Sequence, residues 1–151
     1  YVRRDQVALI AFRGTSAGLI LPPTRALARA KRSLAGLPGG GGTPLAAGLD
    51  LARQVADAIA RSGRVPSLVL MTDGRANVAR DETPGAERAE TEALAAARLL
   101  GAEGYRGILV DTARRPRPRA QAIAKAMGAA YVPLPRADAV AISHTVQRSV
   151  A

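Results

Sequence analysis

Two short segments carry side chains whose chemistry suits a hard cation. Residues 39–42 are consecutive glycines that lead into Thr43, and an apolar run ending at Thr72 leads into Asp73. If both segments lie at the carboxyl edge of an open parallel sheet, where such sheets bind ligands, the two side chains meet there. Hydroxyl and carboxylate oxygens are the ligands that Mg²⁺ prefers. The sequence therefore predicts half of a cation site, formed by Thr43 and Asp73.

Each of these two residues also has a structural explanation. Asp73 precedes Gly74, and an Asp-Gly pair stabilises turns at strand ends. Thr43 followed by Pro44 is typical of a helix N-cap and first turn. The glycines favour ligand binding, because so much backbone freedom costs stability and indicates a close approach to a ligand. They do not form a phosphate-binding loop, since no Lys stands beside Thr43.

Further candidates surround this pair. Asp111 ends the next predicted strand. Together with Gly42 and Gly74, it is a candidate for positioning Thr43 and Asp73 without binding the metal itself. His144 is the only histidine. With no Ser or Cys placed to be its partner, we interpret it as a helix-surface or core residue. No catalytic residue is therefore predicted.

The elements that must position these residues alternate between strand and helix. Apolar runs at 7–12 and 17–21 are joined by a turn so short that they must pair antiparallel, and Pro22 and Pro23 end the second run. Further strands are predicted at 67–72, 107–111 and 131–134. Helices are predicted at 24–34, 43–63, 86–103 and 138–150, and another follows the Arg/Pro-rich segment 114–119 and ends at 127–128. This order predicts an α/β, Rossmann-like fold: a mostly parallel sheet with helices on both faces and one antiparallel edge strand.

Composition narrows the class of protein. The 151 residues make one domain, and because apolar residues are 48% but aromatics only 3%, Ala, Leu, Val and Ile must build the core. The lack of Cys excludes disulfides and thiolate zinc sites. The apolar runs are too short to span a bilayer, and the first residues lack the apolar stretch of a signal peptide. A cytoplasmic protein is expected.

The chain carries a formal charge of +10, almost all of it from Arg. Nucleic-acid binding is not favoured, because the basic residues are scattered and stacking aromatics are scarce. The remaining explanations are a genome rich in G and C, which favours Arg and Ala, and an acidic partner or linker. The candidate docking residues for such a partner lie in two groups, Arg25, Arg29 and Arg32, and Arg114, Arg115, Arg117 and Arg119.

Several segments together resemble a known family. The run from Val7 to Gly14, the glycines with Thr43, and the run from Leu70 to Asn77 are similar to a von Willebrand factor A (integrin I) domain. With the Tyr-Val-Pro-Leu-Pro and Arg/Pro-rich segments added, the similarity is greatest to the carboxy-terminal domain of magnesium-chelatase D subunits. The resemblance covers essentially the whole chain.

This family builds a metal-ion-dependent adhesion site from loops that supply Asp-x-Ser-x-Ser, a Thr and an Asp. Thr43 and Asp73 match the last two, and no Asp-x-Ser-x-Ser occurs in this chain. The resemblance therefore implies that residues 1–151 are an N-terminally incomplete domain. Its first strand and first helix would lie upstream in the sequence. In the sheet, that strand would lie between the strands at 7–12 and 68–72. The implied metal is Mg²⁺ or Mn²⁺, bound incompletely by this fragment.

The resemblance implies a role in assembly. Magnesium chelatase is a ligase of chlorophyll and bacteriochlorophyll biosynthesis, in photosynthesis, and it inserts Mg²⁺ into protoporphyrin IX at the expense of ATP. The D subunit would be a platform for the I subunit, a hexameric AAA+ ATPase, and for the large porphyrin-binding H subunit, with ATP bound in the complex. This domain would not be catalytic. Its adhesion site would bind a Glu or Asp of a partner, and the acidic linker of its own subunit would face its basic surface.

Other interpretations stay open. The same domain is found in other ATPase-linked systems, such as cobalt chelatase and MoxR-associated proteins. A small-molecule enzyme of doubly wound type would use Asp73 and Asp111, although the phosphate loop of such enzymes is missing. Extracellular adhesion has little support, since the chain has no Cys.

Overall fold

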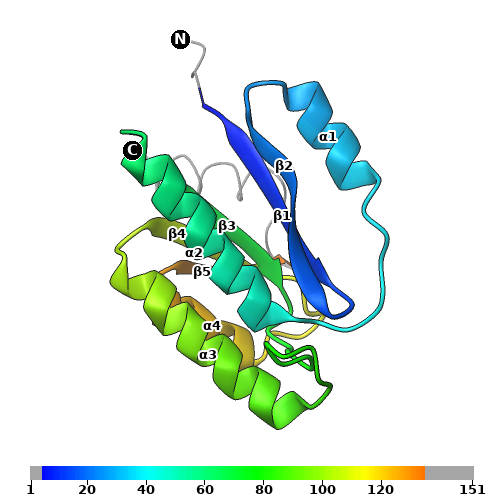
Figure 1. The fold of residues 1–151 in the computed structure, drawn as a ribbon. Helices are drawn as coiled ribbons and strands as arrows, with labels where there is room; N and C mark the ends of the chain where they lie inside the picture. The colour runs from blue at the N-terminus through cyan, green and yellow to red at the C-terminus, as the bar shows by residue number, and fades with distance from the viewer. Residues whose placement is uncertain (1–4, 135–151) are drawn as a thin grey trace.

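The computed structural model describes residues 5–134 (Figure 1). Strands and helices alternate after an opening hairpin, as the sequence predicts. In chain order the elements are β1 (Val7–Arg13), β2 (Ser16–Thr24), α1 (Leu27–Ala35), α2 (Leu45–Arg61), β3 (Ser67–Thr72), α3 (Ala86–Ala102), β4 (Arg106–Asp111), α4 (Pro118–Met127) and β5 (Ala130–Pro133). The predicted helix at 138–150 and His144 lie outside the described residues.

Strands β3, β4 and β5 form a parallel sheet in that order, and β1 pairs with β2 antiparallel. In the parallel sheet Thr72 is paired with Asp111, and Asp111 with Pro133. The carboxyl ends of the three strands therefore lie at one edge, and the loop that begins with Asp73 starts there. The predicted α/β class, with a parallel sheet and an antiparallel edge strand, is confirmed.

The hairpin and the parallel sheet are separate sheets in the described residues, because no strand pairing joins β1 to β3 (Figure 1). Strand β3 exposes large apolar side chains, with Val69 51% and Met71 56% accessible. Two strand edges are thus left without a partner where the family resemblance places its missing first strand. The existence of that upstream strand remains a prediction.

Small aliphatic residues build the core, as composition predicts. Helix α3 packs against both α2 and α4, and α4 also contacts β4 and β5. The approach of α3 to α4 is so close that a Cβ on Gly101 would lie 2.3 Å from the carbonyl oxygen of Ala126. The buried cluster is made mainly of Ala and Leu side chains from these helices and from β4, including Leu45, Leu49, Ala93, Ala97, Leu100, Leu109 and Met127.

The structure corrects the end of the second strand. Strand β2 continues through Pro22 and Pro23 to Thr24, which is paired with Val7 after a register shift in the ladder. Prolines are tolerated because β2 is an edge strand with only one pairing neighbour in the described residues. Thr24 does not cap a helix; its hydroxyl accepts a hydrogen bond from the N–H of Ala26 at 3.1 Å, and α1 begins only after that turn.

Candidate functional site

The glycine loop packs against the turn of the hairpin. The N–H of Gly14 donates to the carbonyl oxygen of Gly42 at 3.0 Å. A Cβ on Gly42 would lie 2.4 Å from the carbonyl oxygen of Gly14 and 2.6 Å from Cγ2 of Val78. The close approach that the glycines indicated is therefore made, at Gly42, to the protein's own backbone. This contact fixes where the chain enters the Thr43 loop.

Thr43 is held by Asn77 and does not cap a helix. The N–H of Thr43 donates to Oδ1 of Asn77 at 2.7 Å, and the N–H of Asn77 donates to the carbonyl oxygen of Thr43 at 3.2 Å. The N-cap position of α2 is Pro44, and no side chain caps that helix. The predicted N-cap role of Thr43 is thus wrong, and its hydroxyl is not used to start α2. The Thr43 loop is instead joined to the loop that follows β3.

Asp73 begins that second loop, directly after β3. One oxygen, Oδ1, accepts from the N–H of Arg75 at 2.9 Å, and Oδ2 lies 3.4 Å from Nε of Arg75. The first contact is the turn-stabilising role predicted for an Asp-Gly pair. The side chain remains 37% accessible, so solvent still reaches the carboxylate.

Gly74 makes this turn possible. Its φ is +78°, which favours glycine, and a Cβ there would lie 2.5 Å from the backbone nitrogen of Ala120 in α4. Its N–H donates to the hydroxyl of Thr72 at 3.1 Å. Gly74 therefore supports Asp73 by letting the loop pass directly over the start of α4.

Asp111 lies fully buried at the end of β4. It accepts from the N–H of Ala113 at 2.9 Å and from the hydroxyl of Tyr131 at 2.5 Å. Burial, and then the hydrogen bond to Asp111, raises the pKa of Tyr131 above its usual range. The N–H of Thr112 donates to the carbonyl oxygen of Thr72 at 3.1 Å. Both oxygens of Asp111 are therefore occupied, Oδ1 by the loop that follows β4 and Oδ2 by Tyr131 of β5.

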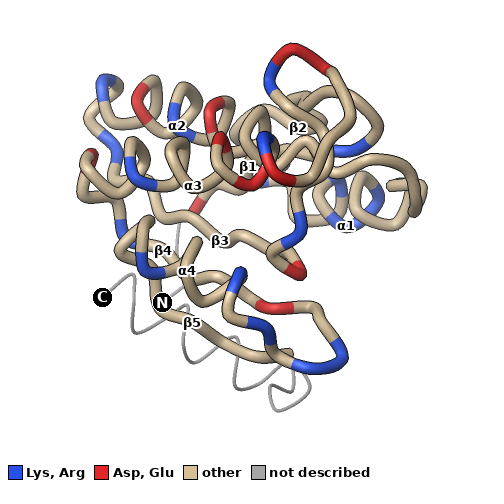
Figure 2. Tube along the Cα trace, turned by 90° about the horizontal axis from the view of Figure 1, so that it is seen from below, with Lys and Arg blue, Asp and Glu red and all other residues tan. Residues whose placement is uncertain are grey.

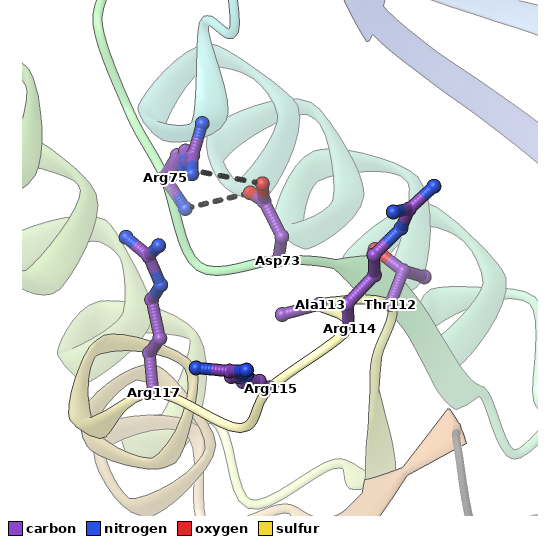
Figure 3. A pocket seen from close by; sticks show the side chains of 7 residues that line it. All are labelled: Asp73, Arg75, Thr112, Ala113, Arg114, Arg115 and Arg117. Carbon is purple, nitrogen blue, oxygen red and sulfur yellow. Dashed lines mark hydrogen bonds and ion pairs between the residues drawn. The ribbon is translucent and has the colours of Figure 1, made fainter.

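A cavity of about 400 Å³ opens between the loops that follow β3 and β4 (Figure 3). Four of its lining side chains are arginines, and Asp73 is the single acid. The lining residues are Asp73, Arg75, Thr112, Ala113, Arg114, Arg115 and Arg117. The loop that follows β4 stands out as a run of basic residues in Figure 2.

The predicted docking arginines fall into different environments. Arg119 is in the first turn of α4 and pairs with Glu90 of α3 at 3.0 Å, so it is directed away from the cavity that the other arginines of its segment line. The second group is separate from the cavity: Arg25 precedes α1, and Arg29 and Arg32 lie on it, all of them exposed.

The described residues do not complete a metal site. Thr43 and Asp73 offer oxygen donors of the kind that Mg²⁺ prefers. In residues 5–134, however, no group of three or more His, Cys, Asp or Glu side chains could hold a metal ion, and Arg75 already occupies the carboxylate of Asp73. A divalent ion here would need further ligands from elsewhere.

Sequence reasoning missed the residues that join these loops. Asn77 lies 34 residues from Thr43, and no spacing rule predicts that hydrogen bond. Arg75 follows Asp73 closely, but whether its side chain turns back onto the carboxylate depends on the turn geometry. The sequence predicts that Tyr131 lies on a strand, but it does not show the hydrogen bond from Tyr131 to Asp111.

Comparison with known proteins agrees with this architecture. Residues 1–75 match the von Willebrand factor type A domain family. The chain is 51% identical to the 60 kDa magnesium-chelatase subunit of Cereibacter sphaeroides, over 97% of this chain and 26% of that protein. It is 38% identical to the 67 kDa subunit of Heliobacterium mobile, over 99% of this chain and 23% of that protein. The chain thus spans about a quarter of the length of these relatives.

Solved structures share the fold. The manganese-loaded TRAP protein of Plasmodium vivax superposes with a TM-score of 0.68 at 17% identity, over 97% of this chain and 58% of that one. The SpRpn10 VWA domain gives a TM-score of 0.57 at 13% identity, over 96% of this chain and 70% of that one. Among the described residues, no helix has both the length and the apolar character needed to cross a membrane. The sequence match and the shared fold together show that the chain belongs to the von Willebrand factor type A domain family.

Proposed function

We propose that this chain is a docking domain of the D subunit of an ATP-dependent magnesium chelatase, the cytoplasmic enzyme that inserts Mg²⁺ into protoporphyrin IX. The identity of 51% over nearly the whole chain supports this assignment. The domain contributes assembly and is not itself catalytic. Its partners are the AAA+ ATPase I subunit and the porphyrin-binding H subunit.

The docking site is centred on Thr43 and Asp73. The observation that carries this proposal is the pair of hydrogen bonds between Thr43 and Asn77, which joins the Thr43 loop to the loop of Asp73 at the carboxyl edge of the sheet. The hydroxyl of Thr43 is free of helix capping, and the carboxylate of Asp73 is accessible. Thr43 can therefore offer its hydroxyl oxygen to a metal ion, and Asp73 can offer its carboxylate once the ion displaces Arg75.

The rest of the site lies outside these residues. We propose that upstream sequence supplies the missing strand and the remaining ligands, and that an acidic side chain of a partner subunit completes the site. A divalent ion bound there would supply the positive charge that attracts this partner acid. Until such an ion binds, Arg75 balances the charge of Asp73. Asn77 keeps Thr43 in place in either state.

Replacing one carboxylate in the complete D subunit tests the proposal. Asp73→Asn keeps the Oδ1 acceptor for the turn but removes the charge, whereas Asp81→Asn removes a charge from the same loop at a residue paired with Arg88. We expect Asp73→Asn to weaken Mg²⁺-dependent binding of the partner subunits by more than about tenfold and to reduce chelation with it. Asp81→Asn should leave both unchanged.

The readout is co-purification of the I and H subunits in Mg²⁺ and in EDTA, together with an assay of Mg²⁺ insertion. Wild-type binding should fall in EDTA to the level of Asp73→Asn. If Asp73→Asn assembles and inserts Mg²⁺ like the wild type, the docking role of this carboxylate is wrong.

A second candidate is a domain of the same family in another ATPase-linked system, such as a cobalt chelatase or a MoxR-associated protein. The uncharacterized protein Rv2850c of Mycobacterium tuberculosis is 38% identical over 97% of this chain, the same identity as the Heliobacterium chelatase subunit. Identity at that level does not separate the two systems. Insertion of Mg²⁺ against Co²⁺ by the purified complex distinguishes them.

A further inference from the structure

The cavity beside Asp73 has an excess of positive charge that the other side chains of residues 5–134 do not balance. We call its arginine lining, Arg75, Arg114, Arg115 and Arg117, the arginine pocket. Only Arg75 has an acidic partner within the described residues, and that partner is Asp73. Arg114, Arg115 and Arg117 are exposed and form no ion pair with the described part of the chain. Figure 3 shows their guanidinium groups spread around Asp73.

The loop that presents these arginines is held in place before any ligand arrives. Pro116 and Pro118 flank Arg117, and each proline fixes its own φ. Behind them, buried Asp111 accepts the N–H of Ala113. A loop ordered in this way loses less conformational entropy on binding, so the arginine pocket is preorganised for an anion.

The chemistry of the loop favours carboxylates over phosphate. Phosphate sites at helix N-termini rely on backbone N–H groups, and Pro118 removes one of them at the first position of α4. Recognition therefore falls to guanidinium groups, which bind carboxylates through paired hydrogen bonds.

The number of arginines indicates more than one carboxylate. Arg114, Arg115 and Arg117 line the same cavity, and each guanidinium group can pair with a carboxylate of its own. We propose that the arginine pocket binds a short acidic segment of a partner protein through ion pairs that need no metal ion. This goes beyond the proposed metal-dependent docking, because it uses Arg114, Arg115 and Arg117 and does not use Thr43.

A binding assay on the complete subunit tests this proposal separately from metal docking. Fluorescein-labelled hexaglutamate is titrated with the protein in EDTA, and binding is followed by fluorescence anisotropy. The pocket variant carries Arg114→Gln, Arg115→Gln and Arg117→Gln. The matched control carries Arg25→Gln, Arg29→Gln and Arg32→Gln, which removes the same charge from exposed positions on and before α1.

We expect the pocket variant to bind the peptide at least about tenfold more weakly, since each exposed ion pair is worth up to about fivefold in affinity. The control should retain most of the binding, Thr43→Val should retain all of it, and salt at about 0.5 M should weaken it strongly. Equal losses in the two triple variants would overturn the proposal, because general charge would then explain binding. So would displacement by pyrophosphate at a lower concentration than by unlabelled hexaglutamate, which would make phosphate the ligand.

Discussion

At the scale of the residue, Thr43 and Asp73 each form a hydrogen bond with a residue of the loop that follows β3. Thr43 is bound through its backbone to Asn77, which leaves its hydroxyl free of helix capping. Asp73 makes the turn that its Asp-Gly sequence predicts and also pairs with Arg75. A structural role and a docking role are therefore compatible at Asp73, because the turn uses Oδ1 and the ion pair at Oδ2 is accessible to solvent.

Gly74 offers a prediction with a close internal control. Gly74 and Gly63 have nearly the same φ, +78° and +77°, but a Cβ on Gly63 has nothing within 4 Å. Gly63→Ala should cost about 1 kcal/mol of unfolding free energy, from backbone strain alone. Gly74→Ala adds a collision with the backbone of Ala120 and should cost about 2–4 kcal/mol.

Denaturant unfolding of the domain, extended by its upstream sequence and followed by circular dichroism, measures both costs. Equal losses for the two variants would mean that the loop after β3 does not lie as tightly on α4 as the structure shows.

Thr43 and Asp73 could be proposed as metal ligands from sequence because their signals are local, a glycine run and an acid at the end of an apolar strand, and that role stays a prediction. Asn77 could not be predicted, because its partner lies 34 residues away in the chain. Gly42 is a candidate from the sequence, but the reason why a glycine is needed there is not visible in the sequence. Only the fold brings Gly14 and Val78 against it.

At the scale of the element, strands and helices with strong patterns were predicted almost to the residue. Strand β3 was predicted at its observed bounds, and α3 ends one residue before its predicted end. Strand β2 was predicted too short because Pro22 and Pro23 normally stop a strand. They do not stop β2, because β2 pairs with β1 alone in the described sheet. The N–H groups on its other edge have no strand to bind.

Helix α2 is tied to the start of β4 by one tyrosine, and this link predicts a pH dependence. The hydroxyl of Tyr105 donates to Oδ1 of Asp57 at 2.6 Å, and this hydrogen bond is the main cause that raises the pKa of Tyr105 to about 12. In the unfolded chain the pKa of a tyrosine is about 10. The hydrogen bond from Tyr105 therefore stabilises the folded state fully below pH 10, and this stabilisation is lost as the pH rises through about 12.

Urea unfolding of the extended domain between about pH 8 and pH 12 checks this link. The wild type should lose stability toward the alkaline end more steeply than Tyr105→Phe, which has no hydroxyl to ionise. Identical pH profiles would contradict a hydrogen bond from Tyr105 to Asp57 in solution.

At the scale of the whole molecule, the main feature is that one edge of β1 and one edge of β3 have no strand partner within residues 5–134. Side chains such as Val69 and Met71 are more than half accessible beside the edge of β3. Unpaired edges and exposed apolar side chains favour association with other chains. We therefore predict that residues 1–151 alone unfold without a cooperative thermal transition and bind a hydrophobic dye. The chain extended upstream should melt cooperatively.

Circular dichroism melts of the two fragments make this comparison. A sharp, high-temperature transition of residues 1–151 by themselves would show that the hairpin and the parallel sheet need no strand between them. The expectation of an N-terminally incomplete domain would then lose its physical basis.

Metal binding at Thr43 and Asp73 is what the proposed docking site requires first. Calorimetric titration of the upstream-extended domain with Mg²⁺ and with Mn²⁺ measures it, with Asp73→Asn and Asp81→Asn titrated in parallel. We expect saturable binding that Asp73→Asn abolishes and Asp81→Asn leaves unchanged. If the wild type does not bind either ion, or if Asp73→Asn binds as tightly as the wild type, Thr43 and Asp73 do not form a metal-dependent docking site.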